Sequence, residues 1–361
     1  MIEAISLVDG LRSPFCTDAL RHNQGNSILA MLLEELFIRN QVEKVDEIIL
    51  STFNEDDLVN HTLEKMKINV PFSVLHSLSG LEALLLGMQK IQSGQCDSVV
   101  VAAADFASKM PLIWPREGSF LMRSREIKDW LKLRPRHLKA VDPLKEAIEK
   151  KMSRGKIASQ KVNLCEEEIR AFLEKSKARA LEKQKITEQN ILPIPIAPKY
   201  SSHQLSDEAK GLCDGAVVLL LSRQDLFDNS LGFLLESTKI YAKDFAMLRA
   251  VHSLLEKSNQ TLENFDFLDL DESSIESLVA QEKAFKSDTI CKDMLGFEKA
   301  VGEIKRINPA GGTLSFGDAL NANALCQILT SFAVLEEENK KSALVASESN
   351  HLGIAIQIER E

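Results

Sequence analysis

One stretch decides how this chain folds: Asn308-Pro309-Ala310-Gly311-Gly312-Thr313-Leu314-Ser315-Phe316-Gly317-Asp318. Its two adjacent glycines lie between a strand-like run and a strongly helical one. Glycine is the residue that lets a backbone turn sharply or approach another group closely. The stretch therefore predicts a tight bend of the backbone beside a functional site.

Strand-like and helix-like patterns alternate along the rest of the chain, which predicts a mostly parallel sheet with helices on both faces. In the first part we expect strands at 4–8, 47–51, 72–75 and 98–103, and helices at 27–39 and 81–93. The same order returns later, with strands at 231–237, 265–270, 343–346 and 354–358, a strand and turn at 308–316, and helices at 245–257, 275–285 and 322–336. This recurrence predicts an internal duplication.

Two of these helices, 81–93 and 322–336, are apolar on nearly every side. A helix on the surface of a globular protein is apolar along one stripe only, so a helix that is apolar all round is expected to be buried. We therefore predict that each of the two is sandwiched between sheets.

The composition excludes several classes of protein. With 361 residues, 44% hydrophobic content and a net charge of −9, the chain can bury a large core and is not expected to bind nucleic acid. Its apolar runs are too short for a transmembrane segment, and no targeting pattern opens it, so a cytoplasmic protein is expected. The six cysteines lack metal-ligand spacing and are predicted to be reduced thiols.

The stretch 308–318 resembles the signature of thiolases, N-x-x-G-G-x-x-x-x-G-H-P, except that Asp318 and Ala319 replace the His-Pro pair. Thiolases make or cleave 3-ketoacyl-CoA. Four further segments are similar to motifs of this family, so the resemblance covers nearly the whole chain: Ile5–Phe15, Ser79–Ala83, Leu212–Ala216 and Leu352–Ala355.

The resemblance implies an α/β protein with the thiolase fold, in which two duplicated βαβαβαββ halves form a five-layer α-β-α-β-α core with an inserted helical cap. The N-terminal half would comprise residues 1–107 and 206–228, the cap 108–205, and the C-terminal half 229–361. The spacing between Phe106 and Pro143 is most similar to that of the trifunctional fatty-acid-oxidation β-subunit type of acetyl-CoA acyltransferase.

The reactive positions of the family are substituted in this chain. Ser77 stands where thiolases carry their nucleophilic cysteine, and Ser347 where they carry the acid/base cysteine. Asp318 replaces the histidine of the G-H-P motif. Asp271 replaces the first residue of the family's N-E-A-F or H-E-A-F motif, while Glu272 is kept. The resemblance therefore implies that the residues that shape the site are kept, whereas the residues that react are replaced.

These substitutions predict loss of the thiolase reaction. The family mechanism needs a thiolate, and a serine hydroxyl is far less acidic and less nucleophilic near neutral pH. A carboxylate at Asp318 would also repel the enolate or oxyanion that forms during the reaction. The leading hypothesis is a catalytically inactive relative that acts as a scaffold or regulatory subunit.

The coenzyme site departs from the family pattern as well. Glu208, Lys210 and Gly312 occupy positions that resemble the CoA pocket, but Glu208 replaces an asparagine and the stretch that leads to it is short. We expect no required cofactor and no metal, because no His, Cys and carboxylate cluster has ligand spacing. A coenzyme A thioester remains a candidate ligand.

Two alternatives stay open. Ser77 could act as the nucleophile of an acyltransferase or thioester hydrolase, with His351 or His76 as base and Asp318 as the third member of a triad. The chain could instead be a sensor that binds acyl-CoA without turnover. As partners, the resemblance implies a second copy of the chain, in a homodimer, or a hetero-oligomer with a component of fatty-acid oxidation.

Overall fold

The structure is a computed structural model of the chain, and it describes residues 4–16, 25–53, 62, 70–75, 79–107, 143–192, 211–224 and 226–360. The first part contains β1 (Ile5–Arg12), α1 (Gly25–Arg39), β2 (Glu47–Ser51), β3 (Phe72–Leu75), α3 (Gly80–Gln92) and β4 (Ser98–Phe106). After these come three helices and a returning strand: α6 (Pro143–Lys161), α7 (Glu166–Glu182), α8 (Gln184–Glu188) and β5 (Asp214–Arg223).

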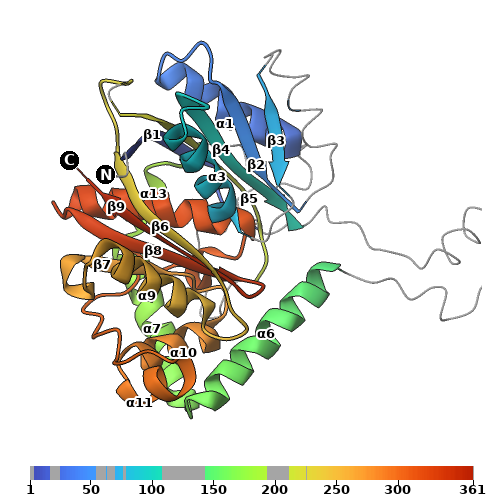
Figure 1. Ribbon diagram of the computed structural model, residues 1–361. Helices are drawn as coiled ribbons and strands as arrows, with labels where there is room; N and C mark the ends of the chain where they lie inside the picture. The colour runs from blue at the N-terminus through green and yellow to red at the C-terminus, as the bar shows by residue number, and fades with distance from the viewer. Residues whose placement is uncertain are drawn as a thin grey trace, which may run out of the picture.

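The second part begins at β6 (Gly232–Tyr241) and repeats the alternation of strands and helices (Figure 1). It continues with α9 (Ala246–Ser258), a 3-10 turn at Leu262–Asn264, β7 (Phe267–Leu270), α10 (Ile275–Phe285), α11 (Asp288–Ile290) and a π-helical turn at Cys291–Leu295. It ends with α12 (Thr313–Phe316), α13 (Asn321–Glu337), β8 (Ser342–Ser349) and β9 (Leu352–Glu359).

The strand order, β3-β2-β4-β5-β1-β6-β9-β8-β7, consists of two halves with the same pairing pattern. In the first half β2 is parallel to β3 and β4, while β5 is antiparallel to β4 and β1. In the second half β7 is parallel to β8 and to a bridge at Ile307, while β9 is antiparallel to β8 and β6. The matching patterns confirm the predicted duplication.

The expectation of a mostly parallel sheet was wrong, because antiparallel pairs outnumber parallel ones. A parallel pair needs a long crossover, whereas β8 and β9 are joined by a two-residue hairpin turn, Asn350 and His351. Both turn residues have positive φ, 46° and 70°, as a type I′ turn requires. The hairpin thus makes the last pair of strands antiparallel.

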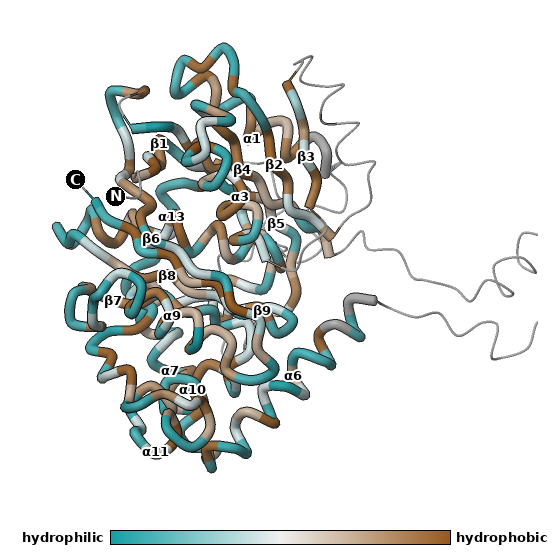
Figure 2. The backbone as a smooth tube through the Cα atoms, viewed as in Figure 1, coloured by the Kyte–Doolittle hydropathy of each residue, from teal (hydrophilic) through white to brown (hydrophobic). Residues whose placement is uncertain are grey.

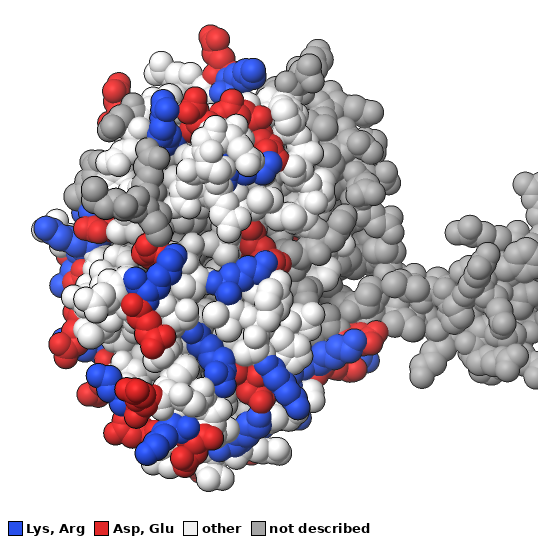
Figure 3. All heavy atoms as spheres, in the orientation of Figure 1, with Lys and Arg blue, Asp and Glu red and all other residues white. Residues whose placement is uncertain are grey.

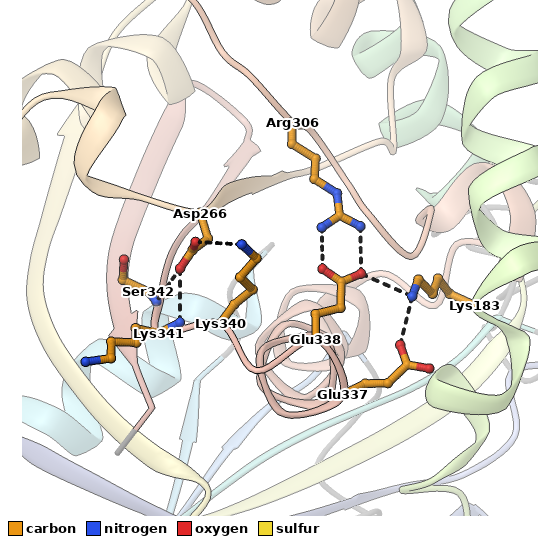
Figure 4. Close-up of polar contacts among 8 residues, drawn as sticks. All are labelled: Lys183, Asp266, Arg306, Glu337, Glu338, Lys340, Lys341 and Ser342. Atoms are coloured by element: carbon orange, nitrogen blue, oxygen red, sulfur yellow. Dashed lines mark hydrogen bonds and ion pairs between the residues drawn. The ribbon is translucent and has the colours of Figure 1, made fainter.

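The duplication extends to single side chains. In the first half, the carboxylate of Asp46 accepts hydrogen bonds from the backbone N–H groups of Asp97 and Ser98, at 2.7 and 3.0 Å. In the second half, the carboxylate of Asp266 accepts from the N–H groups of Lys341 and Ser342, at 3.0 and 3.2 Å (Figure 4). Each aspartate therefore fixes the start of a central strand, β4 or β8, against the strand before it.

Three hydrophobic cores lie between five layers, and the middle core fills the spaces on both sides of the central helices. The helices α3 and α13 share the middle core with the inner faces of both half-sheets. The other face of the first half-sheet packs on α1, and that of the second on α9 and α10. Figure 2 shows the strands as mainly hydrophobic, whereas hydrophilic and hydrophobic segments alternate along α6. The predicted thiolase-type layering and the burial of the two apolar helices are confirmed.

The two central helices come close together at Gly80. A Cβ atom at this position would lie 2.4 Å from the carbonyl oxygen of Asn321, which no real side chain tolerates. Beside this contact, Asp105 at the end of β4 accepts hydrogen bonds from the N–H groups of Phe53 and Asn321, at 2.6 and 2.8 Å. Complete burial raises the pKa of Asp105 to about 6. A glycine and a buried carboxyl group therefore join the two halves.

One predicted element is wrong. Residues 308–316 were expected to form a strand and turn, but after the bridge at Ile307 the chain forms α12, a single helical turn that follows Gly312. The N–H groups of Ser315 and Phe316 donate to the Gly312 carbonyl, at 2.9 and 3.1 Å. Apolar residues at close spacing fit a short strand and a buried helical turn equally well, so the local pattern did not decide between them.

The inserted helices pack mainly on the second half. α6 and α7 lie against α10, α7 also contacts α12, and α8 contacts α13. Ala158, Val162 and Phe172 bury their side chains in the outer core of the second half-sheet. The proposed boundaries of this insertion remain a prediction. No helix in the described ranges is both long and apolar enough to cross a membrane.

An ion-pair cluster fixes the insertion to the C-terminal end of α13 (Figure 4). Arg306 donates to both carboxylate oxygens of Glu338. Lys183, beside α8, lies 3.1 Å from Glu338 and 2.8 Å from Glu337. The hydrogen bonds from Arg306 are the main reason that the pKa of Glu338 falls to about 2. These cations offset the repulsion between Glu338 and the negative end of the helix dipole.

The cluster predicts a specific pH dependence of stability. Because the pKa of Glu338 falls from 4.5 to about 2 on folding, its contribution is complete above pH 4.5 and is lost as the pH falls towards 2. At about 1.4 kcal/mol per pKa unit, we expect E338Q to lower the free energy of unfolding at pH 7 by on the order of 2–3 kcal/mol. Urea unfolding of both proteins from pH 7 to pH 3 measures this.

The control for this prediction is E337Q. The side chain of Glu337 is 45% exposed, and among the described residues its ion pair is with Lys183, so its loss is expected to change stability little. A difference between wild type and E338Q that is equally large at pH 7 and pH 3 would contradict the assignment.

Candidate functional site

A pocket lies where the start of α13 meets the ends of β7 and β8. It brings together three positions predicted from the sequence, Asp271, Asp318 and Ser347. The helix α6 of the insertion forms one of its sides. The remaining lining residues are Phe53, Ser79, Ile148, Lys151, Arg154, Met247, Ser273, Ser274, Ser277, Leu278, Gln281, Leu320, Asn323, Ala324, Gln327, Glu348, Ser349 and Asn350.

Asp318 is bound to the backbone that starts α13. Its Oδ1 accepts hydrogen bonds from the N–H of Leu320, at 2.9 Å, and from Nδ2 of Asn323. In return, Oδ1 of Asn323 accepts from the N–H of Ala319 at 2.9 Å. This exchange orders the turn of residues 318–320 that leads into α13. The side chain that replaces the family's histidine therefore holds a turn.

Ser347 faces the central layer from β8. Side chains alternate along a strand, and Val345 packs in the middle core whereas Leu344 and Ala346 pack in the outer one. Ser347 follows Val345 by two positions and so shares its face. Its side chain is 5% exposed, and no hydrogen-bond partner for its hydroxyl is found in the part of the chain that the structure describes.

Glu272, the residue kept from the family motif, is buried and structural. The Ser176 hydroxyl of α7 lies 2.8 and 2.9 Å from its two oxygens, and Nδ2 of Asn308 donates to Oε1 at 2.8 Å. Burial raises its pKa, and these hydrogen bonds oppose the shift. A Cβ atom on Gly312 would lie 2.7 Å from Oε2. Gly312 thus gives Glu272 room and does not line the pocket.

The predicted bend at the paired glycines is confirmed. The side chain of Asn308 exchanges two hydrogen bonds with the backbone of Leu270, at 2.7 and 2.8 Å, as a neighbouring strand would. Its φ of 45° is tolerated by asparagine, and Gly311 has a φ of 71°. A Cβ atom on Gly311 would lie 2.9 Å from the carbonyl oxygen of Ser176. The bend therefore lets α7 pack against the loop.

The insertion places two cations in the pocket. Nζ of Lys151 lies 3.5 Å from Oδ2 of Asp318, and Arg154 donates to Oδ1 of Asn350 at 3.1 Å. The helix α6, which carries both cations, lies close to the core at Gly155, where a Cβ atom would be 2.5 Å from Oγ of Ser274. A positive helix face therefore covers a pocket whose other charged lining residues are acidic.

Acidic groups lie both at the pocket and beneath it. Glu348 lines the pocket and accepts from Nε2 of Gln281 at 2.9 Å, and burial raises its pKa. Beneath it, the oxygens of Asp269 accept from Gln327 and Ser331 of α13, each at 3.0 Å. Burial is the main reason that the pKa of Asp269 rises to about 7. Ionised forms of both groups are thus disfavoured.

The other predicted positions are placed as follows. Ser77, Glu208 and Lys210 lie outside the described residues. Asp271 accepts from the N–H of Ser273 at 2.8 Å, in a local turn. His351 lies exposed in the β8–β9 turn, with Nδ1 3.1 Å from the carbonyl oxygen of Lys243, and is not among the lining residues. The structure therefore does not bring His351 to the pocket.

The sequence analysis missed four groups at the site: Asp269, Glu348, Lys151 and Arg154. The two acids lie in strand patterns that indicate only burial. For the two cations one signal was available, because Ile148, Lys151 and Gly155 recur at the three- and four-residue spacing of one helix face. Among the described residues, no group of three or more His, Cys, Asp or Glu side chains is arranged to hold a metal ion.

Comparison with curated proteins finds thiolases along the whole chain, although no protein-family model matches it. The chain is 22% identical over 414 aligned positions to the β-ketoadipyl-CoA thiolase of Acinetobacter baylyi, covering 98% of each protein. It is also 22% identical to the mitochondrial trifunctional enzyme subunit β of Homo sapiens, covering 96% of this chain and 86% of that protein. Because the chain is 22% identical to both relatives, these identities do not assign it to either type of thiolase.

Solved structures of thiolases superpose on the full length of the chain. The Bacillus anthracis acetyl-CoA acetyltransferase matches with a TM-score of 0.79 at 17% identity, covering 100% of this chain and 99% of that one. Human mitochondrial 3-ketoacyl-CoA thiolase in complex with CoA matches with a TM-score of 0.77 at 15% identity, covering 100% and 98%. These similarities show that the chain has the thiolase fold.

The buried carboxyl group of Asp269 predicts a gain in stability for D269N. Since the pKa of Asp269 rises from 3.8 to about 7 on folding, the folded state loses stability as the pH rises through this window. Asparagine has no such titration and can still bond Gln327 and Ser331. We expect similar unfolding free energies at pH 4 and a D269N protein more stable by on the order of 2–4 kcal/mol at pH 8.

Chemical denaturation at pH 4, 6 and 8 measures this difference, with D97N as the control. The side chain of Asp97 is 62% exposed, so D97N is expected to follow the wild type at each pH. A D269N protein that is less stable than the wild type at pH 8 would show that the ionised carboxylate stabilises the fold.

Proposed function

Because this chain belongs to the thiolase superfamily, we propose that it is a member that does not perform thiolysis and that serves as a scaffold or regulatory subunit in fatty-acid oxidation. Relatives that match it over nearly their whole length are thiolases, and one of them is named as a subunit of a trifunctional enzyme. A dimer of this chain, or an assembly with such a component, fits the same proposal.

One observation carries the proposal: the side chain at the family's histidine position, Asp318, is bonded to the start of α13 on one side and faces Lys151 on the other. A general base needs a free acceptor near the proton that it removes. Here Oδ1 accepts from Leu320 and Asn323, and the ammonium group of Lys151 lies 3.5 Å from Oδ2, between that oxygen and any substrate proton. The geometry supports a structural role for Asp318.

The electrostatics of the pocket support the same reading. Three carboxyl groups line it, from Asp271, Asp318 and Glu348, and the cations that face them come from α6. The thiolase reaction builds negative charge, which is stabilised by donors and dipoles directed at the developing anion. Ser347, where the family has a thiol, supplies only a weakly acidic hydroxyl. Such a pocket disfavours the enolate intermediate.

Binding of acyl-CoA without turnover remains a second candidate function. A solved relative with this fold is described in complex with CoA, and this chain has a pocket at the start of the central helix α13. The helix α6 lines that pocket with Lys151 and Arg154, so an acyl-CoA would have to share it with these two side chains. The scaffold proposal requires no ligand and is therefore preferred.

The proposal predicts no thiolysis by the purified protein. With acetoacetyl-CoA and a long-chain 3-ketoacyl-CoA, each with free CoA, turnover is expected to be at least 10⁴-fold below that of an active thiolase assayed alongside, because the thiolate and the histidine are both replaced. Absorbance of the ketoacyl enolate measures the rate. The S77A protein is the matched control and is expected to behave identically.

Two results would overturn this function. One is thiolysis that S77A abolishes. The other is an acyl adduct on Ser77, seen by intact mass after incubation with acyl-CoA, which would establish an acyltransferase or hydrolase. Calorimetric binding of acyl-CoA without either result would establish the sensor.

A further inference from the structure

The pocket has a core side and an α6 side of opposite charge. Among the described lining residues, the core contributes three acids, Asp271, Asp318 and Glu348, and no lysine, arginine or histidine. Lys151 and Arg154 both come from α6. Figure 3 shows both basic and acidic side chains along α6. Two exposed residues of this helix, Lys150 and Glu146, form an ion pair at 2.8 Å. The positive charge inside the pocket is thus supplied by α6 alone among the described lining residues.

Lys151 occupies the pocket as a bound ammonium ion would. Its Nζ lies 3.5 Å from Oδ2 of Asp318, which is beyond an ordinary hydrogen-bond length, and its side chain is 28% exposed. A part-exposed ion pair of this length contributes little stability. An external ammonium group can therefore take the place of Lys151 at small cost.

Two hydroxyl groups in the pocket also lack partners. Ser347 is 5% exposed, and its hydroxyl has no hydrogen-bond partner within the described residues. Oγ of Ser274 is buried without a partner and lies beneath Gly155 of α6. Buried polar groups are almost always hydrogen-bonded, because leaving them unpaired is costly. Of the two, the Ser347 oxygen can accept from a ligand with several N–H donors, whereas the Ser274 oxygen is closed off beneath Gly155.

We propose that this pocket is a binding site for a small molecule with a primary ammonium group. The ammonium group displaces Lys151 from Asp318 and donates its remaining hydrogens to the pocket's hydroxyl and amide oxygens. A primary ammonium has three donors and no acceptor, which matches a site built of carboxylate and hydroxyl oxygens. The inference concerns binding only and stands independently of whether the protein turns over any thioester.

The test uses ethylammonium chloride as the probe and K151A as the variant. Without Lys151, we expect the melting temperature to rise with ethylammonium concentration and to saturate, because a ligand that binds only the folded state stabilises it. The rise should be at least twice that produced by equal concentrations of sodium chloride or tetramethylammonium chloride, which lacks N–H donors. In the wild type, competition by Lys151 should raise the half-saturating concentration at least tenfold.

Two further variants make the test specific. D318N in the K151A background should abolish saturation while leaving the fold intact, because the amide oxygen of asparagine can accept the same hydrogen bond from Leu320. K161A removes another ion pair of α6, with Asp244, and keeps Lys151, so it should respond as the wild type does. If K151A is poorly folded by circular dichroism, K151Q keeps the apolar stem and replaces it.

The proposal is overturned by either of two results. In the first, ethylammonium and tetramethylammonium stabilise K151A equally, so that only charge screening is at work. In the second, the K151A and K151A/D318N proteins respond alike, so that the ammonium group binds elsewhere. Neither result depends on thiolysis, so this proposal and the proposed function can fail separately.

Discussion

The close contact between α3 and α13 at Gly80 is the constraint on which the rest of the structure depends. A Cβ atom there would lie 2.4 Å from the Asn321 carbonyl oxygen, so the two helices share one layer only because the residue is glycine. Both half-sheets pack against this layer, and the buried Asp105 ties the end of β4 to the start of α13. Separating the helices would therefore open the middle core and move the residues that begin α13, including the pocket lining from Leu320 to Gln327.

Most of the fold could be predicted from the sequence because burial patterns repeat over distances longer than one element. Two all-round apolar helices and two runs of alternating elements predict a duplicated, layered core, and the matching roles of Asp46 and Asp266 show how far that duplication extends. The predictions that were wrong concerned single elements and the direction of neighbouring strands. The strand and turn expected at 308–316 is a helical turn, because the Gly312 carbonyl accepts from the N–H groups that follow it and only tertiary packing selects that conformation. The mostly parallel sheet failed because strand direction depends on connections, and the β8–β9 hairpin is defined by two residues.

The candidate site was predictable where a motif fixed a position and unpredictable where packing did. The resemblance placed Asp271, Asp318 and Ser347, and the pocket unites them. It offered no position for Lys151 or Arg154, because no motif covers α6 and the rotation of an inserted helix depends on its contact at Gly155. His351, by contrast, was near the site in sequence only. Its positive φ fits the hairpin turn, and the turn directs it to solvent. Nearness along the chain therefore did not imply nearness at the pocket.

The signature residues separate into two groups once their contacts are compared. Asn308, Gly312 and Glu272 are bonded or packed to each other, and Ser176 of the insertion joins them, so changing any one would disturb a buried hydrogen-bond network. Asp318 and Ser347 face the pocket, where a polar side chain of similar size is accommodated by the turn before α13, by Lys151 or by the pocket itself. Packing thus holds the first group in place whether or not the reaction occurs, whereas only chemistry would require a histidine and a thiol in the second. A kept thiolase signature is therefore physical support for the fold, and the side chains at the pocket are what decide the function.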